Sequence, residues 1–416
     1  METEQRPRSE DDTLQRRTIL QRSTPRQRLR LALLRALGLP LRLISPMQSS
    51  PPPSDASILL IRPDHLGDLL FLTPALRYLR EGFPDAHITL MVGPWGQEMA
   101  EENEYVDDVI TCSFPGFERQ AEGSLLAPYR MALREARKVR RKGFDLVLVM
   151  RFDHWWGAVV AAAAGIPRRI GYATSEVEPI LTQALPHVAG LHEVQQNLNL
   201  VSSLAFSAAD PGAQGGDPGA FPLAWREEIA DAEWASRWLL LQGAVAERPL
   251  VAIHAGSGAA VKLWTTDKWA AVADALSERR DAQILLTGSA GELDRVWAIA
   301  ARMRTDPLIA AGETTLGQLA ALYAQCRLVM GPDCGPLHLA VAVDTPTVHL
   351  YGPVDARTFG PWGDSFWHRV VIGNWPCVPC NRIDYAEAEL PAHLCVRDIG
   401  VDQVLAQAEP LLAGAR

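Results

Sequence analysis

The chain has 416 residues, of which 48% are hydrophobic and 21% charged, the balance of an ordinary folded protein. This length exceeds what one compact core usually serves and predicts two domains with additional segments. The formal net charge of −9 argues against a basic body that binds nucleic acid. Six cysteines are too few and too scattered for a disulfide scaffold, which indicates a reducing compartment.

Residues 1–57 are predicted to form an arginine-rich leader. Between Thr13 and Ser50 it has eight arginines and no acidic residue. From Leu29 its leucines and arginines alternate at roughly helical spacing, which fits either a disordered leader or a basic helix on an anionic membrane surface. Arginine and proline interrupt this stretch well short of the ~20 apolar residues that span a membrane, and it has no secretory cleavage site.

Residues 58–206 are predicted to form the first domain, in which buried strands alternate with helices. The expected strands are 57–63, 87–93, 106–112, 145–150 and 168–173, and the expected helices are 68–83, 127–144 and 155–166. The outward side chains of the helix at 127–144 form a basic face. Continuous apolar strands separated by helices indicate a parallel sheet that is covered on both faces.

A stretch rich in glycine, proline and alanine, residues 207–223, is predicted to be a linker. The alternation then restarts in a second domain, residues 224–395, which a C-terminal helix at 396–416 follows. The expected strands are 249–256, 282–288, 327–333 and 346–352, and the expected helices are 232–243, 266–280, 291–303, 314–326 and 335–343. Ligands of such sheets bind outside the carboxyl ends of the strands, so the turns there are where chemistry is expected.

The turn after the first strand holds two carboxylates, Asp64 and Asp68, on either side of Gly67. A carboxylate there could cap the following helix. It could also act as a general base, kept ionised by the helix dipole. The residues of the turn leave both interpretations open.

The turn after the strand at 249–256 contains Gly256, Ser257 and Gly258. It is a near miss to the dinucleotide fingerprint, because the third glycine is absent and no helix starts at once, so a nicotinamide cofactor is not expected. A glycine–serine turn lets backbone N–H groups approach an anion, and Lys262 is close enough in sequence to add a positive charge. The alternative is an ordinary connection with a solvated lysine.

The turn after the strand at 327–333 contains Asp333, Gly335 and His338. A helix start beside a glycine favours an anion. Asp333 would repel a phosphate, so it either accepts hydrogen bonds from sugar or ribose hydroxyls or caps the helix. Glu292 follows another strand. Together these turns suit a ligand with several polar parts, such as a sugar nucleotide.

With its segments in this order, the chain resembles glycosyltransferase family 9, the ADP-heptose:lipopolysaccharide heptosyltransferases. The resemblance covers residues 57–412 and rests on ILLIRPDHLGDLLFLTPALRYLREGFPDAHITLMV, HEVQQNL, IHAGSGAAVKLWTTDKWAAVADAL, GPDCGPLHLAVAVDTPTVHLYGP and the cysteine-containing tail. It implies an α/β chain with the GT-B fold, in which two doubly wound Rossmann-like domains face a central cleft. The acceptor would bind the N-terminal domain and ADP-heptose the C-terminal one. The resemblance also implies inversion at the anomeric centre without a metal or other cofactor.

By this resemblance Asp68 matches the family's catalytic carboxylate and Lys262 its phosphate-binding lysine. The predicted donor-binding residues are Gly256, Ser257, Lys262, Glu292, Asp333, Cys334, Gly335 and His338. The family usually has threonine where Cys334 stands, a difference that bears on donor-sugar specificity rather than on reaction type. Asp68 is accordingly predicted to deprotonate the acceptor hydroxyl, while Lys262 and the helix start at Gly335 stabilise the ADP leaving group. Asp64 is assigned to the turn itself.

The sequence therefore predicts an enzyme that transfers heptose from ADP-heptose to a lipid-linked lipopolysaccharide core acceptor. It would work in the cytoplasm of a Gram-negative bacterium, in contact with the anionic inner membrane, and would not bind nucleic acid. Transfer of another sugar, or transfer to protein, fits the same fold, and a non-catalytic sugar-nucleotide-binding protein is the alternative of another class. In the tail, Cys377, Cys380 and Cys395 are candidate metal ligands, although reduced structural thiols are the preferred interpretation.

Overall fold

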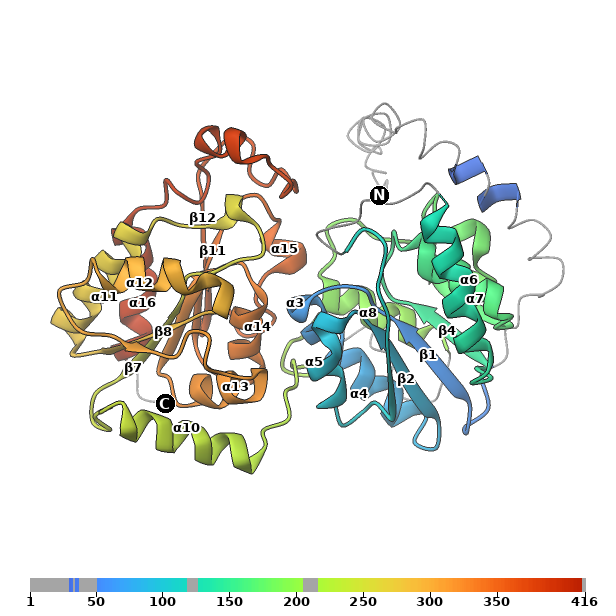
Figure 1. Ribbon diagram of the computed structural model, residues 1–416, viewed down its shortest axis with the longest axis horizontal. Coiled ribbons are helices and arrows are strands. Elements are labelled where there is room, and N and C mark those ends of the chain that lie inside the picture. Colours follow the sequence, from blue (N-terminus) through green and yellow to red (C-terminus); the bar gives the residue numbers. More distant parts are fainter. Residues whose placement is uncertain (1–29, 33, 37–50, 118–125, 205–215, 414–416) are drawn as a thin grey trace, which may run out of the picture. The chain divides into compact units, whose positions relative to one another are not determined.

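The computed structural model describes residues 30–32, 34–36, 51–117, 126–204 and 216–413 (Figure 1). Most of the predicted leader and much of the predicted linker lie outside the described residues. The described residues belong to two compact units, one within Met1–Ser49 and Glu122–His187 and the other within Ser50–Ala121 and Val188–Arg416. The domain boundaries derived from the sequence remain predictions.

The first sheet has six strands in the order β3-β2-β1-β4-β5-β6. They are β1 (Ser57–Ile61), β2 (His87–Val92), β3 (Asp108–Thr111), β4 (Leu146–Val149), β5 (Arg168–Tyr172) and β6 (Gln183–Leu185). The strand pairs β1–β2, β2–β3, β4–β5 and β5–β6 are parallel, with Ser57 opposite His87 between β1 and β2. Every residue of β4 and β5 is buried, as expected where helices cover both faces of a parallel sheet.

The second sheet also has six parallel strands, in the order β12-β11-β10-β7-β8-β9. They are β7 (Leu250–His254), β8 (Gln283–Thr287), β9 (Leu308–Ile309), β10 (Leu328–Pro332), β11 (Thr347–Tyr351) and β12 (His368–Ile372). The strand order reverses direction at β7 and β10. In doubly wound sheets a crevice opens at that point, at the carboxyl ends of the strands.

Helices cover both sheets (Figure 1). In the first half of the chain they are α3 (Leu66–Leu70), α4 (Thr73–Gly82), α5 (Gln97–Glu101), α6 (Ala127–Arg140), α7 (Trp155–Ala164) and α8 (Glu193–Ser202), with 3-10 turns η1 (Pro94–Gly96) and η2 (Glu178–Ile180). In the second half they are α10 (Ile229–Leu241), α11 (Thr266–Arg280), α12 (Leu293–Ala300), α13 (Leu316–Ala324), α14 (Gly335–Ala342), α15 (Ala356–Phe359) and α16 (Val401–Ala413), with η3 (Ala260–Lys262), η4 (Ala290–Glu292) and η5 (Glu387–Ala392).

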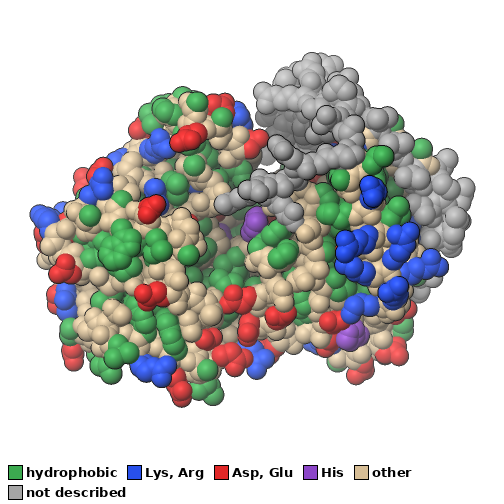
Figure 2. Space-filling model, viewed as in Figure 1, with side chains coloured by type: hydrophobic (Ala, Val, Ile, Leu, Met, Phe, Trp, Pro, Cys, Tyr) green, Lys and Arg blue, Asp and Glu red, His purple; other side chains and the backbone are tan. Residues whose placement is uncertain are grey.

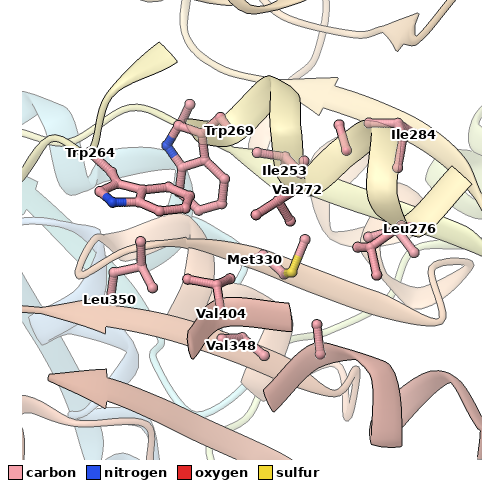
Figure 3. Close-up of a cluster of buried hydrophobic side chains, with 14 of the residues drawn as sticks. Ile253, Trp264, Trp269, Val272, Leu276, Ile284, Met330, Val348, Leu350 and Val404 are labelled. Atoms are coloured by element: carbon pink, nitrogen blue, oxygen red, sulfur yellow. The ribbon is translucent and has the colours of Figure 1, made fainter. Parts of the chain in front are cut away.

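The core of the second sheet lies between its central strands and the helices α11 and α16 (Figure 3). Its labelled members are Ile253, Trp264, Trp269, Val272, Leu276, Ile284, Met330, Val348, Leu350 and Val404. The two tryptophan rings meet edge to face at 4.8 Å between centroids. The indole N–H of Trp264 donates to the carbonyl of Ile399 at 3.0 Å, which satisfies its one polar atom inside the core.

The parallel α/β architecture predicted from the sequence is confirmed, with differences at the ends and edges of elements. The helix expected at 68–83 is two helices, because the chain breaks at Phe71 and Leu72 and α4 restarts with Pro74 in its first turn. The strands β6, β9 and β12 were not predicted. All three are edge strands that are short or half-exposed, so they lack the continuous apolar run of a central strand.

Among the helices that the structure describes, none combines the length and the apolar character that crossing a membrane requires.

We expect Leu276→Ala to lower the free energy of unfolding by about 2–5 kcal/mol, because Leu276 is fully buried between α11 and the second sheet. Urea unfolding followed by tryptophan fluorescence measures the change. Leu240→Ala is the matched control, since the same atoms are removed from a side chain that is 75% exposed. Equal losses of stability in the two variants would contradict this assignment of the core.

Candidate active site

The turn that follows β1 is organised around a buried guanidinium. Arg62 is 1% exposed and pairs with Asp64 (Nε–Oδ2 2.7 Å), Glu193 (Nη2–Oε1 2.8 Å) and Asp68 (Nη2–Oδ1 3.4 Å). It also donates to the amide oxygen of Asn197 at 3.0 Å. Burial lowers the pKa of Arg62, but its three carboxylate partners outweigh burial and raise the pKa above its ordinary value.

The two carboxylates of this turn have different environments. Asp64 is 2% exposed and forms a buried ion pair with Arg62. This environment is consistent with a structural role in the turn. Asp68 keeps 29% of its side chain exposed. The N-cap position of α3 belongs to His65, and Asp68 lies inside the first turn with its carboxylate on Arg62. Because α3 has five residues, that guanidinium is a stronger source of positive potential than the helix dipole on which the sequence argument relied.

The turn that carries Asp68 lies directly against the start of α14. A Cβ built on Gly67 would lie 3.2 Å from Cδ2 of His338, and one built on Gly335 would lie 2.9 Å from the Cβ of Leu66. A side chain at Gly335 would therefore force a shift, and one at Gly67 would require the imidazole of His338 to give way by a few tenths of an ångström. The ring of Phe71 also packs edge-on against His338, at 4.6 Å between centroids. The structure thus brings together the two turns that the sequence analysis selected separately.

Asp333 is the centre of the nucleotide-sugar turn. It is 7% exposed, and its Oδ2 lies 2.6 Å from Nζ of Lys262, while its Oδ1 lies 3.8 Å from Nε2 of His338. The hydroxyl of Ser257 donates to the backbone carbonyl of Asp333 at 3.3 Å. Burial raises the pKa of Asp333, but Lys262 and His338 outweigh burial and hold the pKa well below its usual range. The expected phosphate-binding lysine is therefore paired with a carboxylate in this state.

Cys334 is the N-cap residue of α14, immediately after Asp333. Burial raises the pKa of its thiol, and the neighbouring Asp333 carboxylate adds to the rise. The thiol therefore stays protonated at neutral pH, and a reactive thiolate is not part of this turn.

Glu292 lies against the glycine turn after β7. A Cβ on Gly256 would fall 1.8 Å from Oε1 of Glu292, so a side chain there would force the Glu292 carboxylate to move. Ser289 donates to Oε2 of Glu292 from its backbone N–H and its hydroxyl, each at 2.8 Å, and Nε2 of His254 lies 4.0 Å away. Burial raises the pKa of Glu292, but His254 and Ser289 together lower it below its ordinary value. Glu292 therefore sits beside the predicted donor turn as an ionised group.

His192 is a residue of this region that the sequence analysis quoted only within a motif. Its Nδ1 accepts from the N–H of Val194 at 3.2 Å and its Nε2–H donates to the carbonyl of Gly360 at 3.1 Å. Burial lowers the pKa of His192 to about 4, so the ring is neutral at pH 7, as that pair of hydrogen bonds requires. The ring also packs against Trp362 at 4.6 Å between centroids. It thereby joins the start of α8 to the loop after α15.

Arg62, Glu193 and Asn197 are further residues of the site that stand in the quoted motifs but were not singled out from the sequence. The signal for Arg62 was present, because an arginine that directly continues an apolar strand needs carboxylate partners once buried. The partners in α8 could not be identified in this way, since Asn197 lies 135 positions along the chain from Arg62.

The three tail cysteines do not form a preassembled metal centre. Cys377 and Cys380 are exposed and Cys395 is buried. In the part of the chain that the structure describes, no three histidine, cysteine or acidic side chains are grouped so that they could hold a metal ion. The Sγ of Cys380 lies 3.5 Å from the hydroxyl of Tyr385.

Solved structures of glycosyltransferases share this architecture. A glycosyltransferase family 9 protein of Veillonella parvula DSM 2008 has a TM-score of 0.68 at 23% identity, over 86% of this chain and 97% of that protein. The Escherichia coli ADP-heptose lps heptosyltransferase II has a TM-score of 0.65 at 23% identity, over 86% of this chain and 98% of that protein. The fold is therefore that of a GT-B glycosyltransferase.

The chain belongs to glycosyltransferase family 9 (heptosyltransferase), whose sequence model matches residues 132–389. Lipopolysaccharide heptosyltransferase 3 of Escherichia coli strain K12 is 26% identical over 325 residues, which are 76% of this chain and 88% of that relative. The fold and the family expected from the sequence are confirmed.

We expect Asp333→Asn to flatten the loss of stability in acid. The pKa of Asp333 is depressed in the folded state and ordinary, about 3.9, in the unfolded state. Its contribution is therefore complete above about pH 5 and is lost as the pH falls through 4 toward the folded pKa. Urea midpoints at pH 7, 5, 4 and 3 measure the slope.

The control for this pH experiment is Asp281→Asn, which changes a carboxylate that is 77% exposed. This variant should follow the wild-type profile. A profile for Asp333→Asn that also coincides with wild type would show that the buried ion pair does not govern acid stability.

Proposed function

We propose that this protein is an inverting heptosyltransferase that transfers heptose from ADP-heptose to a lipopolysaccharide core acceptor. The observation that carries the proposal is the contact between the Asp68 turn and the start of α14, where Gly67 meets Gly335. Membership of glycosyltransferase family 9 supports the reaction class. Relatives named as lipopolysaccharide heptosyltransferases support the sugar and the acceptor.

In the proposed reaction Asp68 is the general base. Its carboxylate takes the proton of the acceptor hydroxyl, and the hydroxyl oxygen attacks the anomeric carbon on the face opposite the diphosphate. The bond from that carbon to the diphosphate oxygen breaks, and ADP leaves with the electron pair. Arg62 orients Asp68 through their ion pair, in which Nη2 of Arg62 lies 3.4 Å from Oδ1 of Asp68.

The leaving group is assigned to the second sheet. Lys262 would exchange its contact with Asp333 for the departing diphosphate, and the backbone N–H groups at the start of α14 would add to the stabilisation. Once released from Lys262, Asp333 becomes an acceptor for sugar or ribose hydroxyls. Glu292 beside Gly256 is a second acceptor of this kind.

Because protein groups stabilise the leaving group, the proposed reaction includes no metal and no other cofactor, and ADP-heptose enters as a substrate. The acceptor is lipid-linked. We therefore place the enzyme at the cytoplasmic face of the inner membrane of a Gram-negative bacterium.

Asp68→Asn should lower kcat by about 10²- to 10⁴-fold, because the amide cannot accept the hydroxyl proton. ADP release from ADP-heptose in the presence of a heptose-free core acceptor measures the rate. The control is Asp85→Asn, which makes the same change at an exposed position. Near-normal transfer by a folded Asp68→Asn protein would remove the proposed base. Tight binding of ADP-heptose without turnover in the wild type would indicate a non-catalytic binding protein.

Asp333→Asn should bind ADP about tenfold more tightly, because Lys262 loses the carboxylate that neutralises it in the free protein. Lys262→Met should bind ADP more weakly than wild type. Calorimetric titration with ADP and with ADP-heptose measures both effects. An Asp333→Asn protein with unchanged ADP affinity and weakened ADP-heptose affinity would instead assign Asp333 to sugar hydroxyls alone.

A further inference from the structure

The exposed side of α6 has a dense set of cations that the proposed reaction does not use. Arg130, Arg134, Arg137, Arg140 and the C-cap residue Arg141 are all exposed. At about 100° per residue they fall within roughly 120° of the helix circumference, and we call this set the basic face. Figure 2 shows Lys and Arg side chains gathered over the region where Figure 1 places α6.

Two exposed leucines lie within the same arc. Leu126 is 65% exposed and Leu133 is 51% exposed. The opposite side of α6 buries the small residues Ala132 and Ala136 together with Val139. The outer side is therefore a mixture of arginine and leucine, which suits the boundary between lipid headgroups and acyl chains.

Among the residues that the structure describes, no carboxylate neutralises the charge of the basic face. The one acidic residue within α6, Glu135, is buried and lies 2.9 Å from Nζ of Lys138. Within the described ranges of the chain, no carboxylate is ion-paired with an arginine of the basic face. Five like charges on one helix side repel one another. The arrangement therefore favours a partner that supplies many negative charges over a broad surface.

The described part of the arginine-rich leader is anchored beside the start of α6. Leu34 is 1% exposed, and the guanidinium of Arg30 lies 4.9 Å from the ring centroid of Trp155 and 2.7 Å from Oε1 of Glu176. The ring of Trp155 in turn lies 5.5 Å from that of Tyr129 in the first turn of α6. A second basic segment is thereby attached to the same compact unit.

We propose that the basic face of α6, with Leu126 and Leu133, docks the protein on an anionic phospholipid bilayer. The choice of occupant rests on the proposed function, because a lipid-linked acceptor is presented at such a surface. Charge complementarity supports it, since anionic headgroups form a negative plane that attracts clustered arginines. The exposed leucines favour a bilayer over a nucleic acid, because a bilayer offers apolar acyl chains and a phosphate backbone does not.

The test compares vesicle binding by the full chain and by the triple variant Arg130→Gln, Arg134→Gln, Arg137→Gln. Cosedimentation in 0.1 M salt uses vesicles of phosphatidylcholine, with or without about 30% phosphatidylglycerol. The wild type should bind the anionic vesicles at least tenfold more tightly than the neutral ones, and the triple variant should lose at least tenfold. Raising the salt to 0.5 M should weaken wild-type binding, because the Debye length shortens.

The matched control is Arg226→Gln, Arg279→Gln, Arg302→Gln, which removes the same charge from exposed ion pairs in the other unit. It should bind anionic vesicles within twofold of wild type. Equal loss in both triple variants would mean that net charge alone governs binding and would overturn the proposal. Full retention of binding by the basic-face variant would overturn it as well.

A third measurement separates this surface from acceptor recognition. The basic-face variant should transfer sugar to a water-soluble, deacylated core acceptor at the wild-type rate. The proposal fails if the variant still binds vesicles but has lost affinity for the deacylated acceptor. It also fails if the variant still binds vesicles but has lost an affinity for duplex DNA that the wild type has. A wild type that transfers no heptose but needs the basic face for vesicle binding would refute the proposed function and leave the docking surface standing.

Discussion

The candidate active site depends on how one buried charge, Arg62, is accommodated. At 1% exposure its guanidinium has lost its water, and such a charge is tolerated only with charged partners and filled hydrogen bonds. Those partners come from the turn after β1 and from the start of α8. The same interaction that holds α8 to β1 therefore orients Asp68. The candidate base is therefore also one of the carboxylates that compensate the buried charge of Arg62.

The two halves of the site differ in charge. Around Arg62 three carboxylates face one guanidinium, so negative charge is in excess there. Around Asp333 the carboxylate is paired with the single ammonium of Lys262, and the imidazole of His338 lies 3.8 Å away. The cation of the second half is therefore already matched by a carboxylate, whereas the first half has carboxylates to spare.

Much of the fold and of the candidate site could be predicted from local sequence, because apolar strands followed by glycine-rich turns are short-range patterns. The carboxylates at the ends of β1 and β10 could be predicted, because they follow these strands closely in the sequence. The ion pair of Lys262 with Asp333 could not be predicted, since it joins residues 71 positions apart and depends on how β7 and β10 pair. The partners of Arg62 in α8 could not be predicted for the same reason. Edge strands such as β12 were not predicted because their exposure removes the apolar run that identifies a strand.

The contact of Gly67 with Gly335 limits what either turn tolerates by mutation. A side chain at Gly335 would collide with the Cβ of Leu66, and one at Gly67 would press on the imidazole of His338. A substitution at Gly335 would therefore shift the turn that carries Asp68, although the two residues lie far apart in the sequence. The spacing between the candidate base and the start of α14 thus depends on the absence of a side chain, a requirement that neither charge nor hydrogen bonding at the site reveals.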